Sequence, residues 1–188
     1  MNDKQTLDYY DAHAEAYFKQ TYSVGFSDIY EKFINELPNI PQQTIPDVGC
    51  GSGRDSIHFA QKGFKVTAID GSPALLGLAK ESTDHAIEWK QILFEDISKQ
   101  NWKNQFSGIW ACASLLHVPF AELSSIVTAL SYCLKPEGVM YLSFKYGNSE
   151  RVDGDRFFCD LNERRIDKLL NEVSKQNLIS ILLYQKSV

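Results

Sequence analysis

TIPDVGCGSGRDSIHFA (residues 44–60) decides the fold of this chain, because it joins an apolar stretch to a helical pattern through three closely spaced glycines. The apolar stretch ends at Asp47-Val48, and the glycines follow at positions 49, 51 and 53. This order predicts a strand, a glycine-rich turn and the first turn of a helix. Glycine lets the backbone approach a ligand closely, and the free N–H groups of a helix N-terminus attract a polar or negative group.

The spacing of the glycines distinguishes this turn from a dinucleotide-binding fingerprint. That fingerprint places its third glycine three positions after the second, which is where Arg54 stands in this chain. Arg54 therefore argues against a nicotinamide-dependent oxidoreductase. The pattern is instead Asp-x-Gly-x-Gly-x-Gly, with Asp47 two residues before Gly49.

Composition indicates one ordinary globular domain, which we place at residues 1–188. Hydrophobic residues make up 44% of the 188, the formal net charge is −5 and the pI is about 5.4. This acidity argues against nucleic-acid backbone binding, so no DNA partner is expected. The polar N-terminus predicts no signal peptide, and no apolar run is long enough for a membrane span, so we expect a cytoplasmic protein. The four scattered cysteines form no C-x-x-C pair, and no metal is expected; the oligomeric state stays open.

Strand and helix patterns alternate five times along the chain. Residues 1–38 carry two amphipathic runs, which predict an N-terminal helical cover over a core at residues 44–188. After the glycine turn, strands are predicted at 64–70, 87–93, 107–113 and 138–145, and helices at 56–61, 74–81, 120–134 and 162–173. The alternation predicts an α/β fold, a Rossmann-like, doubly wound and mostly parallel sheet with helices on both faces. A last strand at 179–184 is expected to join antiparallel beside the fifth.

An acid closes the second predicted strand. Asp70 would lie outside the carboxyl end of a parallel sheet, where ligands of such sheets bind, and it can accept both ribose hydroxyls of an adenosine. The alternative is a helix N-cap made by Asp70 or Ser72, and the two roles are compatible.

The chain resembles the class I S-adenosylmethionine-dependent methyltransferases in several consecutive segments. They are the glycine turn, VTAIDGS (66–72), FEDI (94–97), IWACASLLHVP (109–119) and LKPEGVMYLSFKYG (134–147), in that family's order. Within the family, the chain looks most like small bacterial methyltransferases of the tellurite-resistance or thiopurine-like type.

The resemblance implies S-adenosylmethionine as cofactor and assigns its contacts. The loop 49–53 would cradle the methionine part, with Asp47 and the carbonyl near Ala111 at its ammonium group, and Asp70 would hold the ribose. Residues 93–97 would flank the adenine, and Tyr17 would belong to the N-terminal cover. The implied cofactor-binding residues are Tyr17, Asp47, Gly49, Cys50, Gly51, Ser52, Gly53, Arg54, Asp70, Gly71, Ser72, Phe94, Glu95, Asp96, Ala111, Cys112 and Leu116.

Two features depart from the family pattern. Many members carry an acid at the position of Leu93 to accept the adenine amino hydrogen, whereas the nearest acids here are Glu95 and Asp96. The family sheet usually ends with an antiparallel hairpin of two strands, and this sequence has room for one of them. The predicted sheet therefore has a shortened antiparallel end.

The methyl acceptor is expected at the C-terminal side of the fourth and fifth strands. His117 follows the fourth strand and is the candidate general base, although it can equally be a residue that packs under the next helix. The polar stretch 145–158 carries Lys145, Tyr146, Arg151 and Arg156, which either bind an acidic or aromatic acceptor or belong to a solvated loop.

These residues favour methyl transfer to a small-molecule acceptor by in-line displacement. A non-catalytic S-adenosylmethionine-binding module that regulates or scaffolds a partner is the alternative of a different class. A methyltransferase acting on a protein or tRNA is the other alternative, and it would have a broad open groove instead of a covered cavity. A flipped DNA base is disfavoured, because Ala111-Cys112-Ala113-Ser114 stands where such enzymes carry a clamp for the base.

Overall fold

The computed structural model of the chain describes residues 2–174. The strands of its main sheet are β1 (Thr44–Val48), β2 (Lys65–Asp70), β3 (Ile87–Gln91), β4 (Phe106–Ala111) and β5 (Leu134–Leu142). They are hydrogen-bonded in the order β3-β2-β1-β4-β5, and every neighbouring pair is parallel. The chain order reverses beside β1, and the crevice at such a switch point is where open α/β sheets bind ligands.

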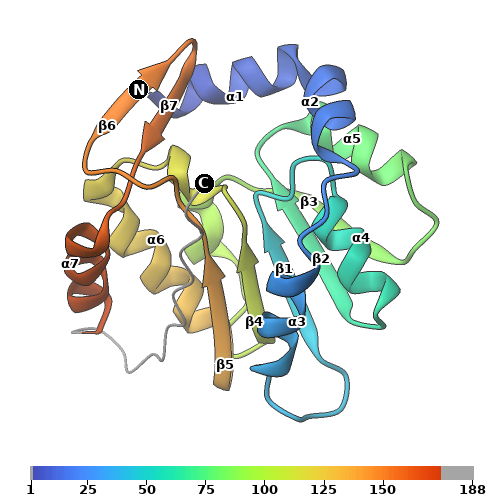
Figure 1. Cartoon of the computed structure of the whole chain (residues 1–188). Coiled ribbons are helices and arrows are strands. Elements are labelled where there is room, and N and C mark those ends of the chain that lie inside the picture. Colours follow the sequence, from blue (N-terminus) through green and yellow to red (C-terminus); the bar gives the residue numbers. More distant parts are fainter. Residues whose placement is uncertain (1, 175–188) are drawn as a thin grey trace.

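Helices cover both faces of this sheet and one of its ends (Figure 1). The α-helices are α1 (Asn2–Ala12), α2 (Ala14–Thr21), α3 (Ser27–Asn35), α4 (Arg54–Gln61), α5 (Pro73–Glu81), α6 (Phe120–Cys133) and α7 (Glu163–Ser174). Two short 3-10 helices follow β3 and β4, namely η1 (Phe94–Lys99) and η2 (Leu115–His117). Helices α3 and α4 pack on one face and α6 with α7 on the other, while α1 and α2 lie across the end where the strands finish (Figure 1).

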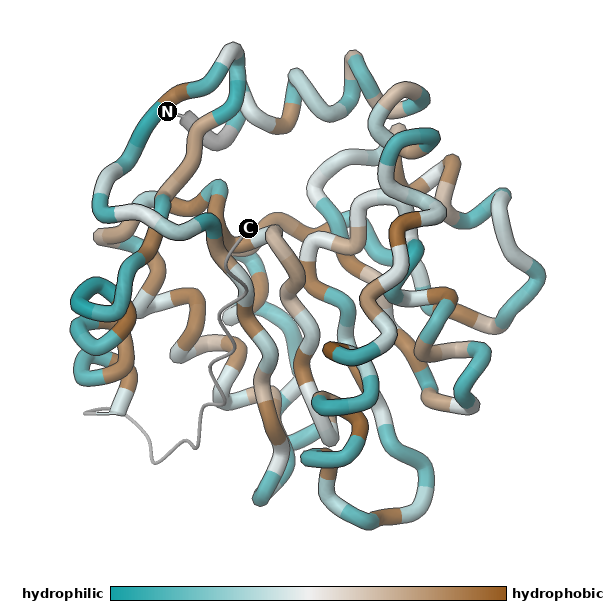
Figure 2. The backbone as a smooth tube through the Cα atoms, in the orientation of Figure 1, coloured by the Kyte–Doolittle hydropathy of each residue, from teal (hydrophilic) through white to brown (hydrophobic). Residues whose placement is uncertain are grey.

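The core follows the alternation of side chains along β4. Ile109 and Ala111 point to the side of α6, whereas Trp110 points to the side of α3 and α4 and is fully buried. Its ring stacks on Tyr141 of β5 with the ring centroids 4.1 Å apart. In Figure 2 the hydrophobic colour follows the central strands and the inner side of the helices, while the outer turns of α7 are hydrophilic.

The predicted α/β fold is confirmed, with element ends shifted by a few residues. The main correction concerns the predicted polar loop 145–158, which contains an antiparallel hairpin of β6 (Glu150–Asp153) and β7 (Arg156–Cys159). Its turn carries Gly154 with a φ of 62°. A glycine after an aspartate is a common hairpin turn, so this signal was present in the sequence.

The hairpin forms a sheet of its own, separate from the five parallel strands. The strand predicted at 179–184 lies outside the described residues. Within residues 2–174, no helix combines the length and apolar character needed to cross a bilayer, and no cluster of three or more metal-ligating side chains occurs.

Candidate active site

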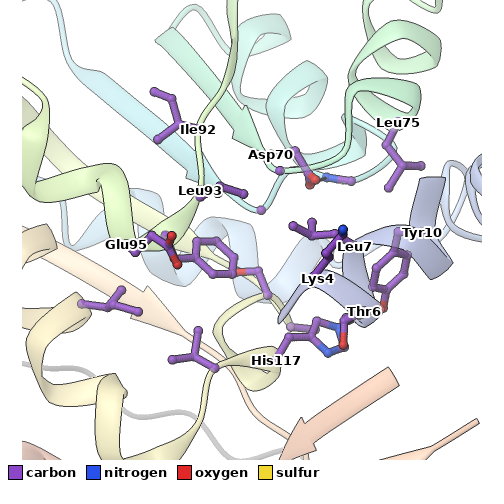
Figure 3. A pocket seen from close by; sticks show the side chains of 18 of the residues that line it. Lys4, Thr6, Leu7, Tyr10, Asp70, Leu75, Ile92, Leu93, Glu95 and His117 are labelled. Carbon is purple, nitrogen blue, oxygen red and sulfur yellow. Dashed lines mark hydrogen bonds between the residues drawn. The ribbon is translucent and has the colours of Figure 1, made fainter. Parts of the chain in front are cut away.

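A cavity of about 380 Å³ lies where the strands of the main sheet end (Figure 3). Its wall combines the loops after β1, β2 and β3 with η2 and α6, and α1 contributes side chains from across the opening. Figure 3 shows Asp70 and Leu93 on one side, His117 on the other, and Leu7 and Tyr10 of α1 between them. We call the Asp70 side the nucleoside end and the His117 side the acceptor end.

The glycine turn presents bare backbone to the nucleoside end. Gly49 and Gly51 have φ angles of 74° and 52°, which favour glycine, and both line the cavity. A Cβ on Gly49 would lie 2.4 Å from the Cβ of Ser114, and one on Gly51 would lie 3.3 Å from a ring carbon of Tyr17. The turn is held to the sheet because the amide of Gly49 donates to the Ile69 carbonyl at 2.8 Å. No other residue type fits at Gly49 without displacing the wall.

Asp70 stands at the end of β2 with its carboxylate fixed by backbone groups. One oxygen accepts a hydrogen bond from the amide of Gly51 at 2.8 Å and the other from the amide of Ser72 at 2.9 Å. Burial raises the pKa of Asp70, and these hydrogen bonds oppose that shift. A carboxylate has about four acceptor positions, so acceptor capacity remains for a hydroxyl donor. The helix cap is supplied by Ser72, whose hydroxyl accepts from the Leu75 amide at 3.2 Å.

An apolar slot continues from Asp70 along the end of β3. Ile92, Leu93 and Leu75 line it, and Leu7 of α1 lies so near Gly71 that a Cβ there would come within 2.6 Å of it. A flat, largely apolar ring fits such a slot. Phe94 and Glu95 also line the cavity, whereas Asp96 pairs with Lys99 outside it. Glu95 is therefore the nearer of the two acids that the sequence offered for the adenine.

Several of the implied cofactor residues do not line the cavity. They are Asp47, Cys50, Ser52, Gly53, Arg54, Ser72, Ala111, Cys112 and Leu116. Asp47 is buried and accepts from the Ser56 hydroxyl at 2.6 Å, and burial, together with the carboxyl of Asp55, raises its pKa. Arg54 forms an ion pair with Asp55 at 2.5 Å. The Ala111 carbonyl accepts from the Ser143 amide at 3.2 Å. These groups are paired within the chain, and their direct contact with a cofactor stays a prediction.

His117 faces the acceptor end and is held on both ring nitrogens. Its Nδ1 lies 2.6 Å from the Phe157 carbonyl, which only accepts, so Nδ1 carries the hydrogen. Nε2 is then the acceptor for the Tyr10 hydroxyl at 2.9 Å. Burial lowers the pKa of His117 to about 4, and the charges of Arg156 and Lys145 contribute to that shift. The imidazole is therefore neutral at pH 7. Tyr10, whose hydroxyl is bonded to it, also lines the cavity.

The cavity wall also includes residues that were not predicted for the site. Lys4, Thr6, Leu7, Ala113, Ser114, Val118, Glu122 and Ile126 line the cavity. Thr6 is buried and its hydroxyl accepts a hydrogen bond from the Phe157 amide at 3.0 Å, which fastens α1 to β7. The amphipathic spacing of residues 1–20 indicated a helix but gave no sign of its place over the sheet.

The four residues predicted for the acceptor do not line the cavity. Tyr146 is 64% exposed and donates to Glu163 at 3.1 Å, and Arg151 pairs with Asp160 at 2.8 Å. Lys145 and Arg156 lie over the ring of Phe158, which contacts the ring of His117 outside the cavity lining.

The residues at the nucleoside end fit an adenosyl cofactor. The wall has open glycine backbone, a carboxylate with free acceptor positions and an apolar slot, in that order. The hydroxyl of Ser114 is buried at the cavity wall without a hydrogen-bond partner in the described chain. Because buried polar groups are normally paired, this orphan hydroxyl indicates a polar ligand group beside Gly49.

The class of protein follows from this geometry together with a family match. A family described as "Methyltransferase domain" matches residues 45–138, which runs from β1 into β5 and includes both Gly49 and Asp70. The chain belongs to this family and to the class I S-adenosylmethionine-dependent methyltransferases.

Individual relatives agree with this class. The ubiquinone biosynthesis O-methyltransferase of Dechloromonas aromatica (strain RCB) is 32% identical over 114 residues, 59% of this chain and 48% of that protein. The protein of the same name from Pseudomonas paraeruginosa is 30% identical over 132 residues, 69% of this chain and 55% of that one. The chain thus spans about half the length of these relatives.

Solved structures show the same fold. The magnesium protoporphyrin IX methyltransferase of Synechocystis PCC 6803 with bound S-adenosylmethionine superposes with a TM-score of 0.71 at 18% identity, over 92% of this chain and 86% of that one.

Proposed function

We propose that this protein transfers the methyl group of S-adenosylmethionine to a small-molecule acceptor. The observation that carries the proposal is the covered cavity. Helix α1 lies over the sheet end and closes a space of about 380 Å³, which suits a nucleoside and a small partner. A protein or tRNA acceptor would need an open groove at this place.

In this proposal, the residues of the chain bind the cofactor and orient the acceptor. The backbone at Gly49 and Gly51 lies against the methionine part, the carboxylate of Asp70 accepts the ribose hydroxyls, and the slot at Leu93 takes the adenine. When bound, S-adenosylmethionine supplies a methyl group on a positively charged sulfur. The remaining task is alignment of the acceptor, and well-oriented placement contributes roughly 7–11 kcal/mol to a bimolecular reaction.

His117 acts in this proposal through Tyr10. Its Nε2 already accepts the Tyr10 hydrogen, so a proton leaving the acceptor would meet the Tyr10 oxygen first. Because its pKa is low, His117 is a weak base at pH 7. We therefore propose that Tyr10 contacts the acceptor and that His117 positions Tyr10. The finer likeness to tellurite-resistance or thiopurine-like enzymes, and the absence of a role on DNA, are proposals of the same kind.

Calorimetry with S-adenosylhomocysteine tests the nucleoside end. The wild-type protein should bind it, and Asp70→Asn should bind roughly a hundredfold more weakly, because the ribose loses charged acceptors. Asp84→Asn makes the same change at an exposed residue outside the cavity and should leave the affinity unchanged.

A screen of small acceptors with labelled S-adenosylmethionine tests the chemistry. Absence of S-adenosylhomocysteine binding by the wild-type protein would overturn the proposal. Binding without transfer to any acceptor would instead favour a non-catalytic cofactor-binding module.

A further inference from the structure

An arginine on β7 lacks a carboxylate partner. Arg156 is half-buried, and its guanidinium lies 4.9 Å from the ring centre of Tyr9 and 5.2 Å from that of Phe158. Across residues 2–174, no carboxylate forms an ion pair with it, and its Nε is buried without a hydrogen-bond partner. Burying a cation with neither an anion nor a full set of acceptors is costly, so this side chain is incompletely satisfied by the described chain.

A second cation lies on the same aromatic ring. The ammonium of Lys145 is 4.0 Å from the ring centre of Phe158, which is itself 2% exposed, and it too makes no ion pair in the described range. Arg151 also contacts this ring, at 4.7 Å, but Asp160 and Asp153 neutralise it. The half-buried Arg156 and the exposed Lys145 therefore place two positive charges without a carboxylate partner beside Phe158.

These two charges lie next to the acceptor end of the cavity. Arg156 lies over the ring of Tyr9, whose centre is 5.7 Å from that of Tyr10, and Tyr10 lines the cavity. The rings of Phe158 and His117 are in contact, with centroids 5.0 Å apart. The acids that line the cavity, Asp70, Glu95 and Glu122, form no ion pair with either cation. The positive charge at this end is thus available to a ligand.

We propose that the acceptor is a small organic acid whose carboxylate extends past the cavity lining at Tyr10 and His117 to Arg156, with Lys145 adding its charge. This inference rests on the proposed function and names the acceptor class for the same site. A guanidinium presents a planar fork of N–H donors that matches the two oxygens of a carboxylate. The neutral His117 and the Tyr10 hydroxyl beside it supply the uncharged polar contacts, and Arg151 and Tyr146 take no part.

Matched probes test the charge requirement. Benzoate and benzamide have nearly the same shape, are small enough for the cavity and differ in charge. Each is titrated by calorimetry into the protein loaded with S-adenosylhomocysteine and into the unloaded protein. Benzoate should bind, and benzamide should bind at least roughly tenfold more weakly, since it lacks the anion.

Variants assign the effect to Arg156. Arg156→Gln should weaken benzoate binding roughly thirtyfold and leave benzamide binding unchanged, because a buried charge loses its partner. Arg156→Lys should fall between the two, since it keeps the charge and loses the fork, and Lys145→Gln should weaken benzoate binding less than Arg156→Gln. Arg164→Gln removes an exposed charge on α7 and is the control, which should match the wild type. Thermal unfolding confirms that each variant is folded.

The outcomes separate the two proposals. Unchanged benzoate affinity in folded Arg156→Gln, or equal affinity for benzoate and benzamide, overturns the acid-binding site even when S-adenosylhomocysteine binds normally. Failure of S-adenosylhomocysteine to bind overturns the proposed function, while the unloaded titrations still decide whether Arg156 holds an acid.

Discussion

The two ends of the cavity are built in different ways. The nucleoside end consists of backbone and short side chains at the ends of neighbouring strands, with Gly51 and Asp70 joined across 19 positions of the chain. The acceptor end consists of side chains from α1, η2 and α6, and β7 packs behind α1 and η2. Its hydrogen bonds join Tyr10 to His117 across 107 positions and Thr6 to Phe157 across 151. The first end is part of the sheet, and the second exists only when two peripheral elements are docked.

This difference indicates where the cavity opens. The turn at Gly49 is tied to β2 by hydrogen bonds and lies against a fully buried core, which resists local opening. Helix α1 is held by a few separate contacts, among them those of Thr6 and Tyr10. Segments with fewer buried contacts open at lower free energy than the core. We therefore expect ligands to enter by displacement of α1 from β7.

The largest effect is expected from a substitution that disrupts the nucleoside end. Gly49→Ala would place a Cβ 2.4 Å from that of Ser114 at a φ of 74°. Overpacking and left-handed strain together should lower the free energy of unfolding by about 2–5 kcal/mol, and S-adenosylhomocysteine binding should be lost. Urea unfolding and calorimetry measure the two effects. Gly77→Ala is the control, because its Cβ meets no atom within 4 Å inside α5, and it should stabilise the protein by about 0.5–1 kcal/mol.

A smaller effect should appear at the acceptor end as a pH dependence. The pKa of His117 is about 4 in the folded protein, below the ordinary value of 6.5. Between these pH values the unfolded chain binds the proton and the folded chain does not. The contribution of His117 is therefore fully present above pH 6.5 and is lost as the pH falls towards 4, by about 3 kcal/mol in total.

His117→Asn removes this titration. Urea unfolding between pH 7 and 4.5 should give a shallower loss of stability for the variant than for the wild-type protein. His85→Asn changes an exposed histidine and should keep the wild-type slope. Parallel curves for the wild type and His117→Asn would show that the imidazole is not buried as a neutral group.

The smallest effect is expected from loss of the hydrogen bond that attaches α1 to β7. Thr6→Val removes the acceptor for the buried amide of Phe157 and should cost about 1–2 kcal/mol of stability. Hydrogen exchange at the Phe157 amide should accelerate, while exchange at Gly51 and Ser72 stays unchanged, because those amides donate to Asp70 in the other end. Equal acceleration at both ends would refute the idea that the ends open independently.

Sequence patterns predicted most of the fold because each pattern is local. The strand, glycine turn and helix around Gly49 follow from residues within a few positions of one another, and the five alternating units lie close to their predicted limits. The hairpin β6–β7 was missed because its polar residues resemble a loop. Only Gly154 after an aspartate marked its turn.

The candidate site divides in the same way. The residues that were predicted and line the cavity are Tyr17, Gly49, Gly51, Asp70, Gly71, Phe94, Glu95 and His117. Leu7 and Tyr10 line it from α1, where no pattern indicated which side of the helix faces the sheet end. Arg156 was one of four polar residues predicted to bind the acceptor. The structure distinguishes it from two of the others, because Arg151 is paired with Asp160 and Tyr146 is hydrogen-bonded to Glu163.

By itself, the sequence determined the parallel sheet, the glycine turn and the acid one strand away, because hydrophobic periodicity and glycine spacing act over short distances along the chain. Tertiary structure alone decided the tautomer of His117, its bond to Tyr10 and the unpaired charge of Arg156. Each of those depends on which groups meet after α1 and β7 dock, and the free energy of that docking comes from contacts between residues far apart in the chain.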